Sequence, residues 1–182
     1  MHTSERHDPS DVAYRFRSGA DWFVATEQPD LQVLRLGANS ERAVDLFQGL
    51  IGNLSTTFDL SIESLRDRLA WRGVDCRRSD VREVIARLKL MLATYGGVEI
   101  AAYSIDDQLT LTPELEIFIY SRTHHWRSKL LAMGLEERTA TPAAVWRPTR
   151  HDLKSAPGLS DSLSAAAQRL GLKPVDTELS KS

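Results

Sequence analysis

The segment from Ser61 to Met91 constrains the fold most strongly, because apolar residues recur at spacings of three and four on both sides of a single glycine. Such spacing places apolar side chains on one face of a helix. Ser61 and Ser79 are typical helix caps, since a serine oxygen accepts hydrogen bonds from the free amides of a first turn. Gly73 separates the two stretches, and glycine readily ends a helix. The segment therefore predicts a helix, a tight turn and a second, arginine-rich helix.

The flanking sequence predicts further elements. "NSERAVDLFQGLIGNL" has one apolar face and a cap at Asn39 or Ser40, which predicts a helix, and "TFDL" predicts a short strand. After Gly96-Gly97, "VEIAAYSIDDQLTLT" is typical of a hairpin with strands over 98–105 and 109–112.

The order of elements from residue 39 to residue 112 is helix, short strand, helix, turn, helix and hairpin. This order resembles the winged helix-turn-helix superfamily. The resemblance is carried by apolar residues in the second and third helices and by a glycine with an apolar neighbour in the turn, namely Leu65, Leu69, Gly73, Val74, Val81, Ile85 and Leu88. It implies an α+β fold with a winged helix-turn-helix core.

The rest of the chain is expected to surround that core. We expect residues 1–13 to be disordered, residues 14–38 to form N-terminal strands that pack on the 39–112 winged-helix domain, and residues 113–135 to form a C-terminal helix. The remaining tail, 136–182, is rich in proline and lacks a sustained apolar period, so we expect it to be mostly disordered with a short helix over 160–170.

The resemblance implies DNA binding, most simply by a dimeric transcriptional regulator that reads double-stranded DNA with the helix at 79–92. Between Ser61 and Leu90 there are eight basic and five acidic residues, an excess of three positive charges, whereas the whole chain has a net charge of −2. The candidate DNA-binding residues are Arg72, Arg77, Arg78, Ser79, Arg82, Arg87 and Lys89.

Acidic residues favour an alternative. Asp106 and Asp107 lie at the expected wing tip, and Asp80 and Glu83 lie on the expected reading helix, where phosphates would be repelled. Charged helix faces are also commonly just solvated. The alternative is therefore a winged-helix protein-interaction subunit of a larger complex, with no direct base readout.

The helix expected after Pro113 has an apolar stripe longer than a small winged unit can cover. A long exposed stripe is usually buried against a second copy or another protein. We therefore predict a homodimer or a protein partner that contacts Phe118, Trp126 and Leu130, with aromatic residues as anchors.

Other chemistry finds little support in the sequence. The single cysteine, Cys76, excludes disulfide frameworks and zinc sites built from cysteine pairs. His124 and His125 are adjacent on the expected helix and would point about 100° apart, so they do not predict a shared metal. No catalytic motif is present and no apolar run reaches the length of a membrane span, so we expect a cytoplasmic protein that is not an enzyme and carries no cofactor.

Overall fold

The computed structural model describes residues 20–141 and 156–176. The described strands are β1 (Trp22–Gln28), β2 (Leu31–Gly37), β3 (Thr57–Ser64), β4 (Leu69–Arg77), β5 (Val98–Tyr103), β6 (Asp107–Leu111), β7 (Ile117–Ser121), β8 (Glu136–Glu137) and β9 (Lys173–Pro174). The described helices are α2 (Ser40–Ile51), α3 (Arg78–Tyr95), α4 (His125–Ala132) and α5 (Pro157–Arg169).

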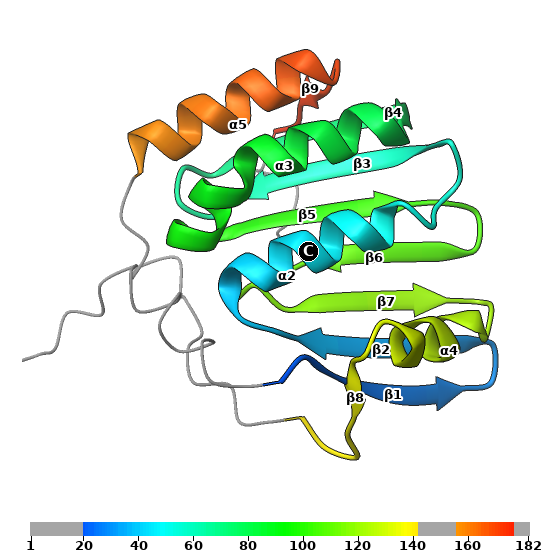
Figure 1. Ribbon diagram of the computed structural model, residues 1–182. Coiled ribbons are helices and arrows are strands. Elements are labelled where there is room, and N and C mark those ends of the chain that lie inside the picture. The colour runs from blue at the N-terminus through cyan, green and yellow to red at the C-terminus, as the bar shows by residue number, and fades with distance from the viewer. Residues whose placement is uncertain (1–19, 142–155, 177–182) are drawn as a thin grey trace, which may run out of the picture.

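The described strands form one nine-stranded sheet in the order β8-β1-β2-β7-β6-β5-β3-β4-β9. Neighbours are antiparallel except for β8, which runs parallel to β1. Because β4 and β5 both pair antiparallel with β3, they run parallel to each other, and α3 provides the crossover that this requires. Figure 1 shows α2, α3 and α4 on the same side of the sheet, with α5 beside α3.

Alternation along the strands separates a core side from an opposite side. In β3, Phe58, Leu60 and Ile62 are buried beneath the helices, whereas Asp59 and Ser61 between them point away from the helices. We call this second side the open face, because none of the helices in the described part of the chain lies on it.

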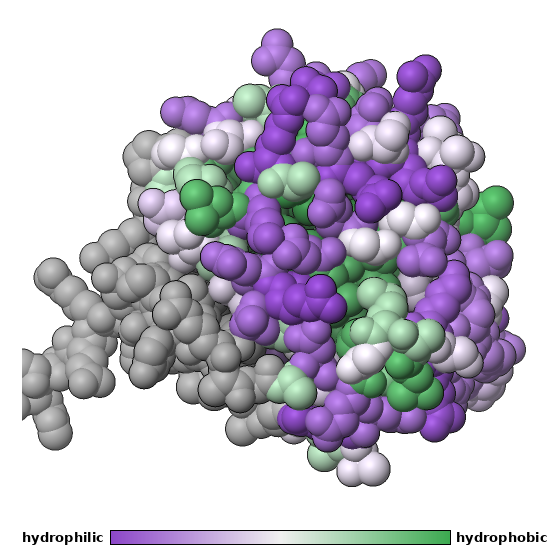
Figure 2. All heavy atoms as spheres, in the orientation of Figure 1, coloured by the Kyte–Doolittle hydropathy of each residue, from purple (hydrophilic) through white to green (hydrophobic). Residues whose placement is uncertain are grey.

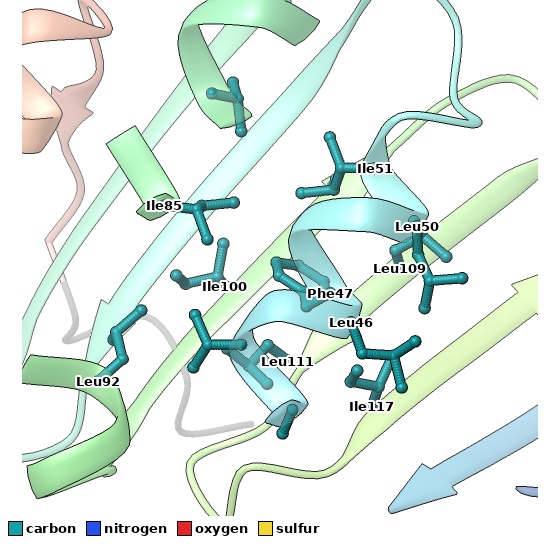
Figure 3. Packing of buried hydrophobic residues seen from close by; sticks show 14 of the residues in the cluster. Leu46, Phe47, Leu50, Ile51, Ile85, Leu92, Ile100, Leu109, Leu111 and Ile117 are labelled. Atoms are coloured by element: carbon teal, nitrogen blue, oxygen red, sulfur yellow. The ribbon is translucent and has the colours of Figure 1, made fainter. Parts of the chain in front are cut away.

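The core fills the space between the helices and the sheet, with α2 and α3 over the central strands (Figure 3). Large side chains from both helices and from the sheet are fully or almost fully buried in it, including Phe47, Leu50, Ile51, Ile85, Leu92, Ile100 and Leu111. Figure 2 shows that the outer side of the helix layer is mainly hydrophilic, with a hydrophobic area near α4, where Leu131 and Met133 are exposed.

The predicted winged helix-turn-helix core is wrong. Residues from Ser61 to Gly73, expected to form a helix and its cap, instead form the end of β3, a turn and the start of β4. Gly73 does not end a helix, because it pairs with Leu60 across the two strands. The protein is a strand-rich α/β sandwich with a mixed sheet, rather than a compact bundle of three helices with a wing.

The C-terminal helix predicted over 113–135 is also wrong. Its first part forms β7, which lies in the interior of the sheet between β2 and β6. Only the eight residues of α4 are helical, and Gly134 follows that helix with a φ of +86°. Ile117 and Ile119 point into the core from β7, so the apolar stripe read from the sequence belongs to two elements.

Several other elements are confirmed. The helix after Asn39 is α2, and the Asn39 Oδ1 atom accepts a hydrogen bond from the Arg42 amide at 2.8 Å. The hairpin is β5–β6, the arginine-rich helix is α3, and the short helix in the tail is α5.

Two predictions concern residues outside the described part of the chain. These are the disordered N-terminus (1–13) and the tail segments over 142–155 and 177–182. Within the described ranges, no helix is long and apolar enough to cross a membrane.

Candidate functional site

The open face has an aromatic half over β1, β2 and β7. Phe118 and Tyr120 stack with ring centroids 6.1 Å apart, and the Arg35 guanidinium lies 5.6 Å from the Phe118 centroid. Arg35 also donates two hydrogen bonds to Glu116, at 2.6 and 2.9 Å, and this pairing raises the pKa of Arg35. The charges of Arg35 and Glu116 therefore neutralise each other on this half of the open face.

The other half of the open face contains a pocket of about 650 Å³ at the β3–β4–β9 edge of the sheet. We call it the edge pocket. The side chains that give it its chemistry are those of Asp59, Ser61, Arg72, Val74, Tyr103 and Lys173.

Strand register explains how these residues meet. Ser61 is directly opposite Arg72 on one side and Ala101 on the other, and Arg72 is directly opposite Lys173. Directly opposite residues of an antiparallel pair have Cβ atoms about 5 Å apart on the same face. The row runs from the small residues Ala101 and Ser61 to two cations, Arg72 and Lys173.

Packing around Gly73 brings Lys173 to this position. A Cβ on Gly73 would lie only 2.4 Å from Leu172 Cδ2, so the missing side chain leaves the space that Leu172 occupies. Gly171 precedes Leu172 with a φ of +66°, a conformation that glycine adopts without steric cost. Leu172 is buried, and β9 then pairs with β4 along Trp71 and Arg72.

A bulge in β4 shapes the far end of the edge pocket. The register shifts between the pairs made by Phe58 and Leu60, and Asp75 has a φ of +52°. The Asp75 amide donates to Asp59 Oδ1 at 3.2 Å, which fixes the Asp59 carboxylate against the bulge. Val74, in the same bulge, is 75% exposed.

The cationic end of the pocket is not neutralised by the residues that the structure describes. Arg72 and Lys173 face each other across β4 and β9, both are exposed, and neither forms an ion pair within the described ranges. Like charges directly opposite each other destabilise a strand pair. The arrangement therefore favours an anion between them.

The predicted DNA-binding residues are divided between the two sides of the molecule. Arg72 and Arg77 lie in β4, where they pair with the open-face residues Ser61 and Thr57 of β3, whereas the others lie along α3 in the helix layer. Arg78 donates to the Leu54 carbonyl at 2.7 Å, and Lys89 pairs with Asp45 at 2.7 Å. These two cations are therefore committed to contacts within the fold.

Glu83 neutralises part of the remaining charge on α3. It accepts hydrogen bonds from Arg169 at 2.9 Å and Arg87 at 2.6 Å, and these arginines lower its pKa, with Arg169 having the larger effect. Of the predicted set, only Ser79 and Arg82 remain exposed on the helix side without an ion pair in the described part of the chain, and Arg77 is exposed at the end of β4.

The residues predicted to form a dimer or partner interface do not share an exposed surface. Trp126 and Leu130 are fully buried on the inner side of α4, whereas Phe118 is half-buried on the open face. An interface made from all three residues is incompatible with these positions, because the sheet separates Phe118 from the other two.

A polar cluster lies beneath the start of α4. Ser121 is fully buried and donates to Asp107 Oδ1 at 2.6 Å, and Trp126 Nε1 donates to the same atom at 2.8 Å. Thr123 lies 2.9 Å from Ser121 and 2.5 Å from His125 Nδ1. Because the Ser121 proton is directed to Asp107, Thr123 donates to Ser121 and His125 donates to Thr123. This chain of hydrogen bonds fastens α4 to β6 and β7.

Reactive-thiol and metal chemistry are not supported by the described residues. Cys76 is buried, and burial raises the pKa of its thiol, with Asp59 and Asp75 adding to the effect. A raised pKa keeps the thiol protonated and weakly nucleophilic. Within the described ranges, no group of three histidine, cysteine or acidic side chains is arranged to hold a metal ion.

Comparison with known proteins gives no match for this chain among protein-family models, curated proteins or solved structures.

Proposed function

We propose that the protein is a binding module that holds an anionic group between Arg72 and Lys173 in the edge pocket. The observation that carries the proposal is the direct pairing of these two exposed cations with no acidic partner in the described part of the chain.

The chemistry of the pocket suits a phosphate or a carboxylate. An arginine donates two parallel hydrogen bonds to such an anion, and a lysine adds a compact positive charge. Ser61 lies next to Arg72 in the same cross-strand row and supplies a hydroxyl donor. The volume of about 650 Å³ lies within the range of small-molecule sites.

The proposal concerns binding without a chemical step. Ser61 is the side chain of the pocket most suited to act as a nucleophile, and nucleophilic serine needs a hydrogen-bonded base. The described side chains provide no such partner for Ser61, and the nearest acid along the strand, Asp59, is hydrogen-bonded to the Asp75 amide.

A titration with inorganic phosphate, followed by backbone amide NMR at constant ionic strength, tests the proposal. We expect saturable shifts in β3, β4 and β9. Arg72→Ala and Lys173→Ala should each lower the affinity about 10-fold or more, because hydrogen bonds to charged groups contribute about 1.5–3 kcal/mol. Arg82→Ala is the matched control, since it removes an exposed cation from the helix side and should leave the affinity unchanged.

Two results would overturn the proposal. One is the absence of saturable binding in the parent protein at tens of millimolar phosphate. The other is equal affinity in the parent and in both pocket variants, which would show that any bound anion lies elsewhere.

DNA binding stays a prediction, now supported by a smaller set of residues. α3 packs between α2 and α5, whereas a major groove about 12 Å wide admits a single helix, so α3 is not presented as a recognition helix. Arg77, Ser79 and Arg82 nevertheless remain exposed near its start and suit contacts with phosphates.

A salt-dependent titration with random duplex DNA separates the two candidates. A steep loss of affinity with salt that is reduced in Arg82→Ala and unchanged in Arg72→Ala would favour DNA on the helix side. A protein partner, self-association and a cytoplasmic location, also expected from the sequence, remain predictions.

A further inference from the structure

The edge pocket has a second row of side chains beside its cationic row. Tyr103 is directly opposite Asp59 across β5 and β3, and the Val74 bulge adjoins Asp59 on the other side. Asp59 and Ser61 are two residues apart on the same face of β3, which places the rows about 7 Å from each other. The pocket is therefore cationic at one end and aromatic and acidic at the other.

The three residues of the second row differ in what they can bind. The Tyr103 ring is 40% exposed and offers a flat surface, and Val74 adds an exposed apolar group. Asp59 uses Oδ1 to accept the Asp75 amide, which leaves Oδ2 as an acceptor for a hydroxyl or amino group of a ligand.

We propose, on the basis of the anion-binding function above, that the edge pocket binds a nucleoside monophosphate. The phosphate lies between Arg72 and Lys173, a ribose hydroxyl donates to Asp59, and the base stacks on Tyr103. A single nucleoside monophosphate then contacts both cations, the Asp59 acceptor and the Tyr103 ring. The separation between its phosphate and its nucleoside matches the distance between the two rows of side chains.

The pocket offers further phosphates little to bind. In this pose the second and third phosphates of a triphosphate extend past Arg72 and Lys173, away from the nucleoside, and among the described lining residues these two cations, already occupied by the first phosphate, are the only ones. A surface that binds nucleotides only through general positive charge has the opposite preference, because it attracts triphosphates most strongly. The order of affinities therefore distinguishes a shaped pocket from a basic patch.

Calorimetric titrations of the full chain with adenosine 5′-monophosphate, ribose 5-phosphate, inorganic phosphate and adenosine 5′-triphosphate test this inference. We expect the monophosphate to bind about 10-fold more tightly than ribose 5-phosphate, since stacking of one base on an aromatic ring has about this effect. Inorganic phosphate should bind more weakly than either, and the triphosphate should bind no more tightly than the monophosphate.

Variants at Tyr103 assign the stacking. Tyr103→Ala should reduce the affinity for the monophosphate about 10-fold, to that of ribose 5-phosphate, without changing the affinity for inorganic phosphate. Tyr103→Phe keeps the ring and should bind like the parent. Tyr120→Ala is the matched control, because Tyr120 lies on the aromatic half of the same face and should not affect binding.

The outcomes separate the two proposals. Saturable phosphate binding with no gain from the nucleoside would overturn the nucleotide assignment and leave anion binding in place. Tighter binding of the triphosphate, or equal loss of phosphate and monophosphate affinity in Tyr103→Ala, would also overturn it. If no phosphate compound binds, both proposals fail.

Discussion

Replacement of Trp126 tests the placement of α4 against the sheet. The side chain is fully buried, and its Nε1 atom donates to Asp107 Oδ1 at 2.8 Å. Truncation of a buried aromatic side chain to alanine costs about 3–5 kcal/mol, so we expect Trp126→Ala to lower the free energy of unfolding by about 4 kcal/mol. Trp126→Phe keeps a ring but loses a hydrogen bond to a charged acceptor, for which we expect a loss of about 2 kcal/mol.

Thermal and urea denaturation followed by circular dichroism measure these losses. For a chain of this size, 1 kcal/mol lowers the melting temperature by about 2–4 °C, so Trp126→Ala should melt about 8–16 °C below the parent. Leu131→Ala is the control, because Leu131 lies in the same helix but is 48% exposed, and its replacement should change the stability by less than about 0.5 kcal/mol.

Sedimentation of the same variants provides the refuting result. If Trp126→Ala keeps the melting temperature of the parent and shifts the protein from a dimer to a monomer, Trp126 lies in an interface and the buried position described above is wrong. If both Trp126 variants lose equal stability, the hydrogen bond to Asp107 accounts for the loss and the packing argument fails.

Two glycine substitutions should have opposite effects on the free energy of unfolding in chemical denaturation. Gly49→Ala should stabilise α2 by about 0.5–1 kcal/mol, since a Cβ there meets no atom within 4 Å. Gly37→Ala should destabilise the sheet, because its Cβ would lie 2.3 Å from the Trp22 ring, and equal effects would contradict this packing. Burial raises the pKa of Glu99, with the charge of Glu63 as the second cause, so ionisation of Glu99 opposes folding increasingly as pH rises through its raised pKa. Glu99→Gln should therefore be more stable than the parent at pH 7, and this gain should disappear below the ordinary glutamate pKa; a gain that is independent of pH would refute the assignment.

The failure of the helix-turn-helix prediction has a specific cause in the sequence. Ile62, Leu65 and Leu69 have helical spacing, but residues 57–64, "TFDLSIES", also alternate between apolar and polar side chains. That alternation predicts a strand. The two periods overlap at Ile62, and long-range pairing with β4 and β5 decides between them, which a local pattern does not reveal.

The segment after Pro113 has a similar ambiguity. The run from Ile117 to Tyr120 contains only β-branched and aromatic residues, which favour a strand, yet Phe118 and Trp126 also fit one helical stripe. By contrast, α2, α3 and the β5–β6 hairpin are predictable because their glycines and apolar periods indicate the same element, although the N-cap of α3 is Arg77 and not the expected Ser79.

The candidate site was only partly accessible from the sequence. The sequence predicts a binding role for Arg72, but on a helix and with DNA as the ligand. Lys173 lies about one hundred residues further along the chain, and no local pattern links it to Arg72. The alternation around Ser61 would have placed Asp59 and Ser61 on one face, but the partner strands that complete the pocket are set by tertiary pairing.

The short strand β9 makes the pocket edge a place where the sheet opens easily. β9 pairs with β4 over only two residues, and one further hydrogen bond joins the Val175 amide to the Ala70 carbonyl at 2.9 Å. Local opening there exposes the Val175 amide to exchange with solvent and separates Lys173 from Arg72. An anion that binds only the paired strands raises the free energy of this opening by RT ln(1 + [L]/Kd). Binding in the pocket should therefore slow hydrogen exchange at this edge of the sheet.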